Sequence, residues 1–129
     1  MQKIDQIMLI DDDEVTNFYH QFIIEEANCC KQIQIFKDSQ NALSFLQDTK
    51  NPMPNIIFLD INMPVMNGWE FLDKYKKLDT KRKRNAVVVM LTTSTNKNDK
   101  EKSKTYREVA HFYSKPLTEK TLFHVMKNM

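Results

Sequence analysis

Short apolar runs alternate along this chain with longer segments whose apolar residues recur at helical spacing. The runs are too short for typical helices, and several are continuously apolar, which is typical of strands covered on both faces of a parallel sheet. The expected strands are residues 7–10, 32–36, 56–59, 86–91 and 111–113. Because helical segments separate them, the sequence predicts an α/β fold, a doubly wound five-stranded parallel sheet flanked by five helices.

The helices are predicted from apolar residues three or four positions apart. These residues are Val15, Phe18, Tyr19, Phe22 and Ile23; then Ala42, Phe45 and Leu46; then Phe71, Leu72, Tyr75 and Leu78; and finally Leu122, Val125, Met126 and Met129. Thr118 stands where a side chain caps the last of these helices. Residues 96–106 are polar nearly all round, and we assign them to a helix because the alternation requires a crossover there.

Size and composition place the chain among ordinary globular domains. It has 129 residues, of which 41% are hydrophobic and 28% charged, and no linker or repeat divides it. We therefore expect a single domain over residues 1–129. No apolar run approaches the roughly 20 residues that cross a bilayer, and no signal peptide precedes the acids at 11–14, so we expect a cytoplasmic protein. The adjacent Cys29 and Cys30 are expected to be reduced thiols.

Charge is unevenly distributed, although the net charge is only +2. Twelve of the nineteen lysines and arginines lie between Lys74 and Arg107, together with three acids, whereas the first 26 residues hold seven acids and one lysine. This polarity can steer partners, but a solvated basic face explains the same pattern. No aromatic residue interleaves the basic tract 81–84, so we do not expect it to bind nucleic acid.

Polar residues that suit phosphate chemistry follow the predicted strands. Asp11 and Asp12 follow the first strand, Asp60 the third, Thr92 the fourth and Lys115 the fifth. The carboxyl ends of parallel strands meet at one edge, where crowded carboxylates repel and a hard cation such as Mg²⁺ relieves the repulsion. A carboxylate beside Mg²⁺ can attack a phosphoryl group. The strand ends therefore predict a phosphoacceptor site.

Each of these residues also has an ordinary structural explanation when it is taken alone. Asp13 with Glu14 fits the N-cap of a helix. Asp60 is equally well explained as a turn residue, Thr92 as a hydroxyl at a strand end, and Lys115 as a surface lysine. The combination of these residue types at one predicted edge favours the phosphoacceptor site over the separate explanations.

Four motifs of the chain resemble those of the receiver domain of two-component response regulators, including the single-domain chemotaxis type. The motifs are MLIDDD at 8–13, FLDINMPVMNG at 58–68, MLTTS at 90–94 and YSKPL at 113–117. They occur in the family's order and nearly its spacing, and the resemblance covers essentially the whole chain. It implies a flavodoxin-like strand order, 2-1-3-4-5, and a single receiver domain without an output domain.

The resemblance implies a role for each residue of the site. Asp60 would accept the phosphoryl group from a histidine kinase or a histidine phosphotransfer protein. Asp12 would bind Mg²⁺ directly and Asp11 mostly through water, while Asn62 would add its backbone carbonyl. Lys115 would contact the phosphoryl group, and the bond to the following proline would be cis.

The resemblance also implies a conformational switch. The hydroxyl of Thr92 would move toward the phosphoryl group and Phe112 would be the coupled aromatic residue, although a core position explains Phe112 equally well. The switch would alter the surface formed by the helix at 96–106, the fifth strand and the last helix. The output would be an unidentified protein target, and neither DNA nor a membrane is expected as a partner.

Two features of the sequence depart from the family pattern. One residue more than expected lies between Thr92 and Lys115, and residues 106–111 replace the usual glycine-containing turn. The only glycine is Gly68, which we expect to supply backbone freedom where the chain enters a helix. Asn62 and Ser94 stand at the positions that tune phosphoryl lifetime in the family.

Three other kinds of protein are weighed against this reading. A Mg²⁺-dependent phosphohydrolase would need a general acid and an insertion that covers its substrate, and the short loops around Asn62 offer neither. A pseudo-receiver would keep the fold without phosphorylation, and the intact set of acidic, hydroxyl and lysine residues argues against it. A flavin-binding protein of similar topology would need phosphate loops rich in glycine.

Overall fold

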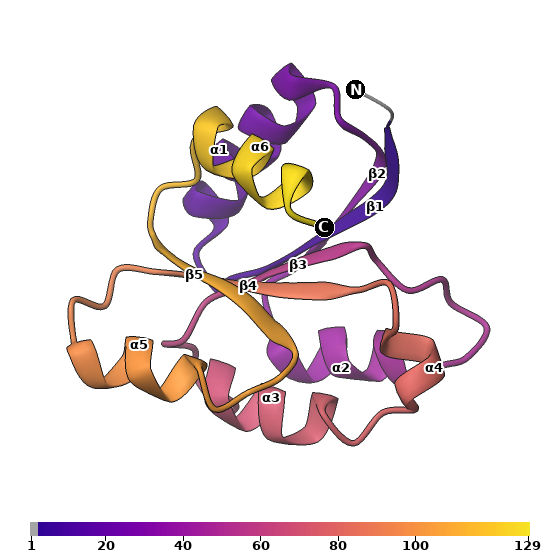
Figure 1. Ribbon diagram of the computed structural model, residues 1–129, viewed down its shortest axis with the longest axis vertical. Coiled ribbons are helices and arrows are strands. Elements are labelled where there is room, and N and C mark those ends of the chain that lie inside the picture. The colour runs from indigo at the N-terminus through magenta and orange to yellow at the C-terminus, as the bar shows by residue number, and fades with distance from the viewer. Residues whose placement is uncertain (1–2) are drawn as a thin grey trace.

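In the computed structural model, which describes residues 3–129, five parallel strands form one sheet in the order β2-β1-β3-β4-β5 (Figure 1). The strands are β1 (Ile4–Ile10), β2 (Cys30–Phe36), β3 (Ile56–Leu59), β4 (Val87–Thr92) and β5 (Val109–Ser114). The helices α1 (Glu14–Ala27) and α6 (Glu119–Lys127) cover one face, while α2 (Ser39–Gln47), α3 (Gly68–Tyr75) and α5 (Lys97–Ser103) cover the other. The expected doubly wound fold and strand order are confirmed.

The interior strand β1 shows why its apolar run is continuous. Its side chains alternate between the two faces of the sheet, and both faces are covered. Met8 and Ile10 join the core under α2 and α3, whereas Ile7 and Leu9 join the core under α1 and α6. All four side chains are at most 1% exposed. The sheet therefore presents its strand ends at a fixed edge between two packed layers.

The helix α1 buries a different face from the one that its apolar residues mark. Four of these side chains are exposed, and Phe18 is 72% exposed. The four are Val15, Phe18, Tyr19 and Phe22. Asn17, His20 and Ile24 are the buried residues of this helix. The helical spacing predicted the helix correctly, but it did not predict which face packs on the sheet.

Residues 3–129 contain a sixth helix, α4 (Thr80–Lys83), in addition to the five that we expected. Within this basic tract, the guanidinium group of Arg82 donates hydrogen bonds to the carbonyl oxygens of Leu46, Asp48 and Asn51 at 2.9, 2.9 and 3.0 Å. These carbonyl groups lie at and beyond the end of α2, where the backbone has no helical partner. Part of the basic tract is therefore structural.

The strand β5 has one residue more than the stretch of β4 with which it pairs. Val88 pairs with Val109, but the next residue of β4, Val89, pairs with His111, so Ala110 is an extra residue in a β-bulge. The register is regular beyond this point, where Thr92 pairs with Ser114. The bulge thus leaves the carboxyl ends of β4 and β5 aligned.

Smaller expectations can be checked against the element bounds. The polar segment at 96–106 does contain a helix, α5. Leu78 and Met129, which we assigned to helical stripes, lie beyond the ends of α3 and α6, and Met129 is 49% exposed. Cys29 and Cys30 are free thiols, as expected. Within residues 3–129, the helices fall short of the length and apolar character of a membrane span.

Candidate functional site

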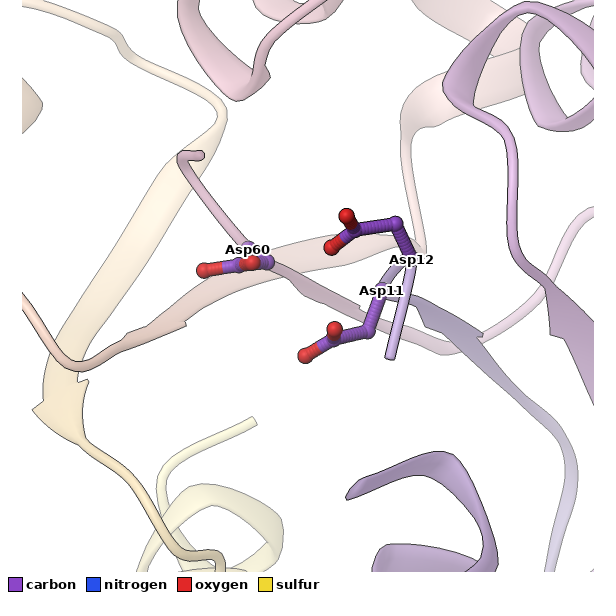
Figure 2. A group of neighbouring side chains, drawn as sticks. All are labelled: Asp11, Asp12 and Asp60. Carbon is purple, nitrogen blue, oxygen red and sulfur yellow. The ribbon is translucent and has the colours of Figure 1, made fainter. Parts of the chain in front are cut away.

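Three carboxylates meet at the carboxyl edge of the sheet, as the sequence predicted (Figure 2). Asp11 and Asp12 directly follow β1, and Asp60 directly follows the neighbouring strand β3. One carboxylate oxygen from each residue lies within 4.8 Å of the other two. Asp11 and Asp60 are 5% and 6% exposed, while Asp12 faces solvent. Hard oxygen ligands in this arrangement, open to water on one side, fit a divalent cation.

Lys115 lies beside two of these carboxylates. Its Nζ atom is 2.5 Å from Oδ2 of Asp11 and 3.3 Å from Oδ2 of Asp60, and the lysine side chain is 13% exposed. Its backbone N–H donates to the carbonyl oxygen of Thr92 at 2.9 Å, and the bond to Pro116 is cis, as expected. Three carboxylates against one ammonium group leave an excess of two negative charges.

The pKa shifts at the site reflect burial and this imbalance of charge. Burial, and secondly the charge of Asp11, raises the pKa of Asp60, while Lys115 and the N–H of Ile61, at 2.9 Å, lower it by less. Burial lowers the pKa of Lys115, but its hydrogen bond to Asp11 and the two carboxylate charges outweigh burial, so the net shift is upward. Uncompensated negative charge in a buried site is what a bound cation relieves, so these residues fit a divalent metal.

The three consecutive aspartates have different tasks. Oδ1 of Asp11 accepts a hydrogen bond from the N–H of Asp13 at 2.9 Å, and the carbonyl oxygen of Asp11 accepts one from Nδ2 of Asn17 at 2.8 Å. Asp13 caps α1, because its side chain accepts hydrogen bonds from the N–H of Val15 and the hydroxyl of Thr16. The capping role that we considered for Asp13 is confirmed, and the helix start orients Asp11.

The only glycine of the chain contributes space at this site, not backbone freedom. A Cβ atom on Gly68 would lie 2.5 Å from the carbonyl oxygen of Asp60 and 3.0 Å from the Cα atom of Ile61. We expected Gly68 to supply backbone freedom, but its φ angle is not positive, so the glycine is not required here for a left-handed backbone. The glycine lets α3 begin directly against the backbone that carries Asp60.

The left-handed residue of this region is Val65, with φ of 67°. The N–H of Met66 donates to the carbonyl oxygen of Pro64 at 2.8 Å, which closes a γ-turn around Val65. A β-branched residue rarely adopts this conformation. Backbone strain therefore lies in the loop that leaves Asp60, with the valine side chain 82% exposed.

Three other predicted residues form no hydrogen bond to the carboxylates within residues 3–129. Thr92 is fully buried, and its hydroxyl accepts a hydrogen bond from the N–H of Ser94 at 3.1 Å. Phe112 is half-buried on β5, where it pairs in register with Met90. Asn62 is exposed, two residues beyond the carboxylate of the third strand. The roles of Thr92, Phe112 and Asn62 remain predictions.

His20 is a residue of this region that sequence reasoning did not identify. It is 2% exposed on α1, and its Nε2 atom accepts a hydrogen bond from the N–H of Leu117 at 3.1 Å. Burial lowers the pKa of His20 to about 4, despite the opposing charge of Asp11, so the ring is neutral at physiological pH and can accept. The bond anchors the segment just beyond Lys115. It joins residues 97 positions apart, so no local pattern could have revealed it.

Comparison with known protein sequences agrees with this geometry. Residues 7–127 match the family described as "Response regulator receiver domain". The chain is 34% identical over 101 residues to hybrid signal transduction histidine kinase D of Dictyostelium discoideum, which covers 75% of this chain and 6% of that protein. It is also 34% identical over 98 residues to response regulator Rcp1 of Synechocystis sp., which covers 72% of this chain and 65% of that protein. The chain thus spans less than two thirds of either relative.

Solved structures show the same architecture. The crystal structure of a two component response regulator from Cytophaga hutchinsonii superposes with a TM-score of 0.91 at 33% sequence identity, covering 98% of this chain and 97% of that one. The crystal structure of the Mn²⁺-bound form of Rcp1 superposes with a TM-score of 0.76 at 30% identity, covering 96% and 90% of the two chains.

Proposed function

Because this chain belongs to the response regulator receiver domain family, we propose that it is a phosphoacceptor of a two-component phosphorelay and that Asp60 receives the phosphoryl group. One observation carries the proposal: Asp60 is buried beside two other carboxylates and a single lysine. Burial raises the pKa of Asp60, and so does the charge of Asp11, which a bound cation can compensate. The location would be the cytoplasm, and the output would be a contact with a protein target.

The orientation of Asp60 supports a direct attack on a phosphohistidine. Its Oδ1 atom is held by the N–H of Ile61, so Oδ2 is the oxygen that would attack phosphorus. A bond from Oδ2 to phosphorus forms as the phosphorus–nitrogen bond breaks, and the imidazole leaves with the electron pair and takes up a proton. Lys115, already 3.3 Å from Oδ2, would then pair with a phosphoryl oxygen.

The metal in this proposal is Mg²⁺. Asp11, Asp12 and Asp60, with the backbone carbonyl of Asn62, would hold it, and when bound it would neutralise charge on the phosphoryl oxygens. Asp11 is already oriented by its own backbone contacts, and Asp12 is accessible from solvent. The Mn²⁺-bound form of the related Rcp1 supports a divalent ion at such a site.

The proposed switch uses the hydroxyl of Thr92. This oxygen accepts a hydrogen bond from Ser94, which leaves its own proton free to donate to a phosphoryl oxygen on Asp60. Because β4 pairs with β5, a shift of Thr92 at the end of β4 would displace residues of β5, which carries Phe112. The surface formed by α5, β5 and α6 would change as a result.

The exposed apolar face of α1 supports a protein as the phosphoryl donor. Val15, Phe18, Tyr19 and Phe22 are exposed on a helix that begins just beyond the carboxylates, and Ile35 of β2 is 37% exposed. Phe18 and Ile35 line a hollow of about 270 Å³. Contiguous apolar surface of this kind marks interaction sites. A histidine kinase or a histidine phosphotransfer protein that covers this face would bring its phosphohistidine to the edge of the sheet.

The acceptor is tested by the intact mass of the protein after incubation with acetyl phosphate and Mg²⁺. We expect a gain of one phosphoryl group in the wild type and none in Asp60→Asn. The matched control is Asp5→Asn. Asp5 is exposed and lies outside the site, where its Oδ1 atom is 3.4 Å from Nζ of Lys31. This variant should gain the phosphoryl group. A gain in Asp60→Asn would place the acceptor elsewhere. No gain in any protein, with no binding of beryllofluoride, would favour a pseudo-receiver.

The donor surface is tested by comparing two kinds of donor. The double substitution Phe18→Ser and Phe22→Ser should slow transfer from a phosphorylated histidine phosphotransfer protein but leave phosphorylation by acetyl phosphate unchanged. Met129→Ser, which removes an exposed apolar side chain from the C-terminus, serves as the control. Equal rates for the double variant and the control would rule out docking on α1.

A further inference from the structure

The end of the sheet opposite the carboxylates has a basic hollow that the proposed function does not use. It lies between α4 and the starts of β4 and β5, with a volume of about 270 Å³. Its polar lining residues are Thr80, Lys83, Arg84, Arg107 and Glu108. The sequence analysis singled out the basic tract 81–84, and this hollow is where part of that tract faces outward.

The charges of this hollow are only partly compensated. Nζ of Lys83 lies 2.8 Å from Oε2 of Glu108, and both side chains are nearly buried, at 11% and 15% exposed. Arg84 and Arg107 are exposed, and within residues 3–129 neither guanidinium group forms an ion pair or a hydrogen bond. Three cations against one carboxylate leave two positive charges in the hollow.

A second hollow continues from the first along the outer edge of β5. It has a volume of about 230 Å³, and Lys100, Lys104 and Phe112 are among its lining residues. Ala110 lines both hollows and is the extra residue of the β-bulge. Because a bulge interrupts the ladder of backbone groups, it disfavours the addition of another strand at this point. An occupant of the two hollows would therefore be held by side chains.

We propose that the hollow between α4 and β5 binds an acidic segment of a partner protein, whose carboxylates pair with Arg84 and Arg107. Guanidinium groups suit this task because they bind carboxylates through two parallel hydrogen bonds. The lining of the two hollows also includes Val87, Ala110 and Phe112, which suits the apolar side chains of a polypeptide. A small anion would use only the first hollow and would leave this apolar strip uncovered.

Binding of the acidic segment in the basic hollow does not require phosphorylation of Asp60. Its lining residues lie in or just after α4 and at the amino ends of β4 and β5, and none belongs to the carboxylate edge. We therefore expect the unphosphorylated protein to bind. Phe112 lines the second hollow, so the contribution of that part would change on phosphorylation if the proposed function holds. The two arginines would bind the partner in either state, and the affinity contributed by the second hollow would depend on whether Asp60 is phosphorylated.

The experiment uses the whole unphosphorylated chain and a fluorescent peptide of glutamate and leucine, with binding followed by fluorescence anisotropy. The double substitution Arg84→Gln and Arg107→Gln should weaken binding by about a hundredfold, since it removes two charge-assisted contacts, each worth about tenfold in affinity. The matched control is Lys120→Gln with Lys127→Gln, which removes two charges from α6 on the other side of the sheet. It should bind as the wild type does.

Several outcomes would overturn the proposal. Equal weakening in both double variants would show a general charge effect, and no binding of the peptide by the wild type would remove the site. Binding of a DNA duplex or of phosphatidylglycerol vesicles that needs the two arginines, without binding of the peptide, would show a different occupant. Amide shifts on peptide addition should centre on Thr80 and Ala110, and shifts centred on α1 would place the peptide elsewhere. Circular dichroism checks that the variants fold.

Discussion

Two lysine–carboxylate pairs lie at opposite ends of the sheet, and they differ in electrostatics. Lys115 lies 3.3 Å from Asp60, and Lys83 lies 2.8 Å from Glu108. Burial and the charge of Asp11 raise the pKa of Asp60. Burial also acts to raise the pKa of Glu108, but its hydrogen bond to Lys83 and the nearby cations outweigh burial, so the net shift is downward.

The difference comes first from burial, since the Asp60 side chain is 7% exposed and that of Glu108 is 15% exposed, and secondly from how many carboxylates share one lysine. Lys115 is shared, because Asp11 holds it at 2.5 Å, closer than Asp60 does. Lys83 has Glu108 as its only carboxylate partner within residues 3–129. The same residue types thus make a structural ion pair at one end and an incompletely neutralised site at the other. The unbalanced end is the one that can gain free energy from a cation or a phosphoryl group.

The largest effect on stability is expected at the balanced end. Lys83→Met leaves Glu108 nearly buried without a partner, which should lower the free energy of unfolding by about 2–4 kcal/mol in urea denaturation. Phosphoryl acceptance by Asp60 should not change. The control is Lys76→Met, whose pair with Asp73 is half exposed and contributes about 0–1 kcal/mol. If Lys83→Met lowered the free energy of unfolding no more than the control does, water would be solvating the unpaired Glu108 carboxylate, and the pair would not stabilise the fold.

The next largest effect on stability is expected at the carboxylate edge, where it depends on bound Mg²⁺. Mg²⁺ at ten times its dissociation constant should raise the free energy of unfolding of the wild type by about 1.4 kcal/mol. Asp12→Asn should lose most of this gain, because Asp12 is the exposed ligand of the cluster. Asp5→Asn should keep the gain. Full stabilisation of Asp12→Asn by Mg²⁺ would contradict a role for Asp12 in binding the metal.

A smaller effect of opposite sign is expected when Asp60 is neutralised. In a chelator, Asp60→Asn should raise the free energy of unfolding by about 0.5–1 kcal/mol, because it removes a carboxylate whose ionised form is disfavoured by burial and by Asp11. Asp11→Asn is the contrasting variant and should destabilise, since Lys115 loses its nearest partner. Destabilisation by Asp60→Asn would show that pairing with Lys115 outweighs the repulsion.

The smallest effect is a difference in pH dependence between Asp60 and Glu108. The pKa of Asp60 is raised from 3.8, so its ionised form destabilises the folded state above the raised value, and the penalty disappears as pH falls through it. The gain from Asp60→Asn should shrink accordingly. The pKa of Glu108 is lowered from 4.5, so its stabilising effect is complete above 4.5 and is lost as pH falls through the lower folded value.

Urea denaturation in a chelator at a series of pH values measures both contributions. The destabilisation caused by Glu108→Gln should persist to more acidic pH than the gain caused by Asp60→Asn. If both disappeared at the same pH, the two carboxylates would not be shifted in opposite directions, and the contrast between the ends of the sheet would fail.

Much of the fold could be predicted because its signals are local. The third strand was predicted residue for residue at Ile56–Leu59, since a continuous apolar run is itself the mark of a strand buried on both faces. Asp11, Asp12 and Asp60 were expected together because each follows a strand, and parallel strands end at one edge. The cluster was therefore within reach of sequence reasoning.

The buried face of α1 was beyond that reasoning. Helical spacing places Phe18 on the apolar face of this helix and leaves the polar His20 off that face. In the structure, however, Phe18 is 72% exposed and His20 is 2% exposed. A histidine can be buried here because the N–H of Leu117 satisfies it, and that partner comes from the far end of the chain. Burial of a polar group depends on its partner, which a local pattern does not contain.

Periodicity and strand direction are properties of neighbouring residues, so the sequence already specified the elements, their layers and the edge where the chemistry lies. Distances between remote groups arise only when the chain folds. The sharing of Lys115 between Asp11 and Asp60, and the space that Gly68 leaves beside the Asp60 carbonyl, are contacts of this kind. Together with burial, which raises the pKa of Asp60, these contacts determine the pKa shifts at the site and the role of the glycine. Electrostatic and steric energies depend on separation in space, not on separation along the chain.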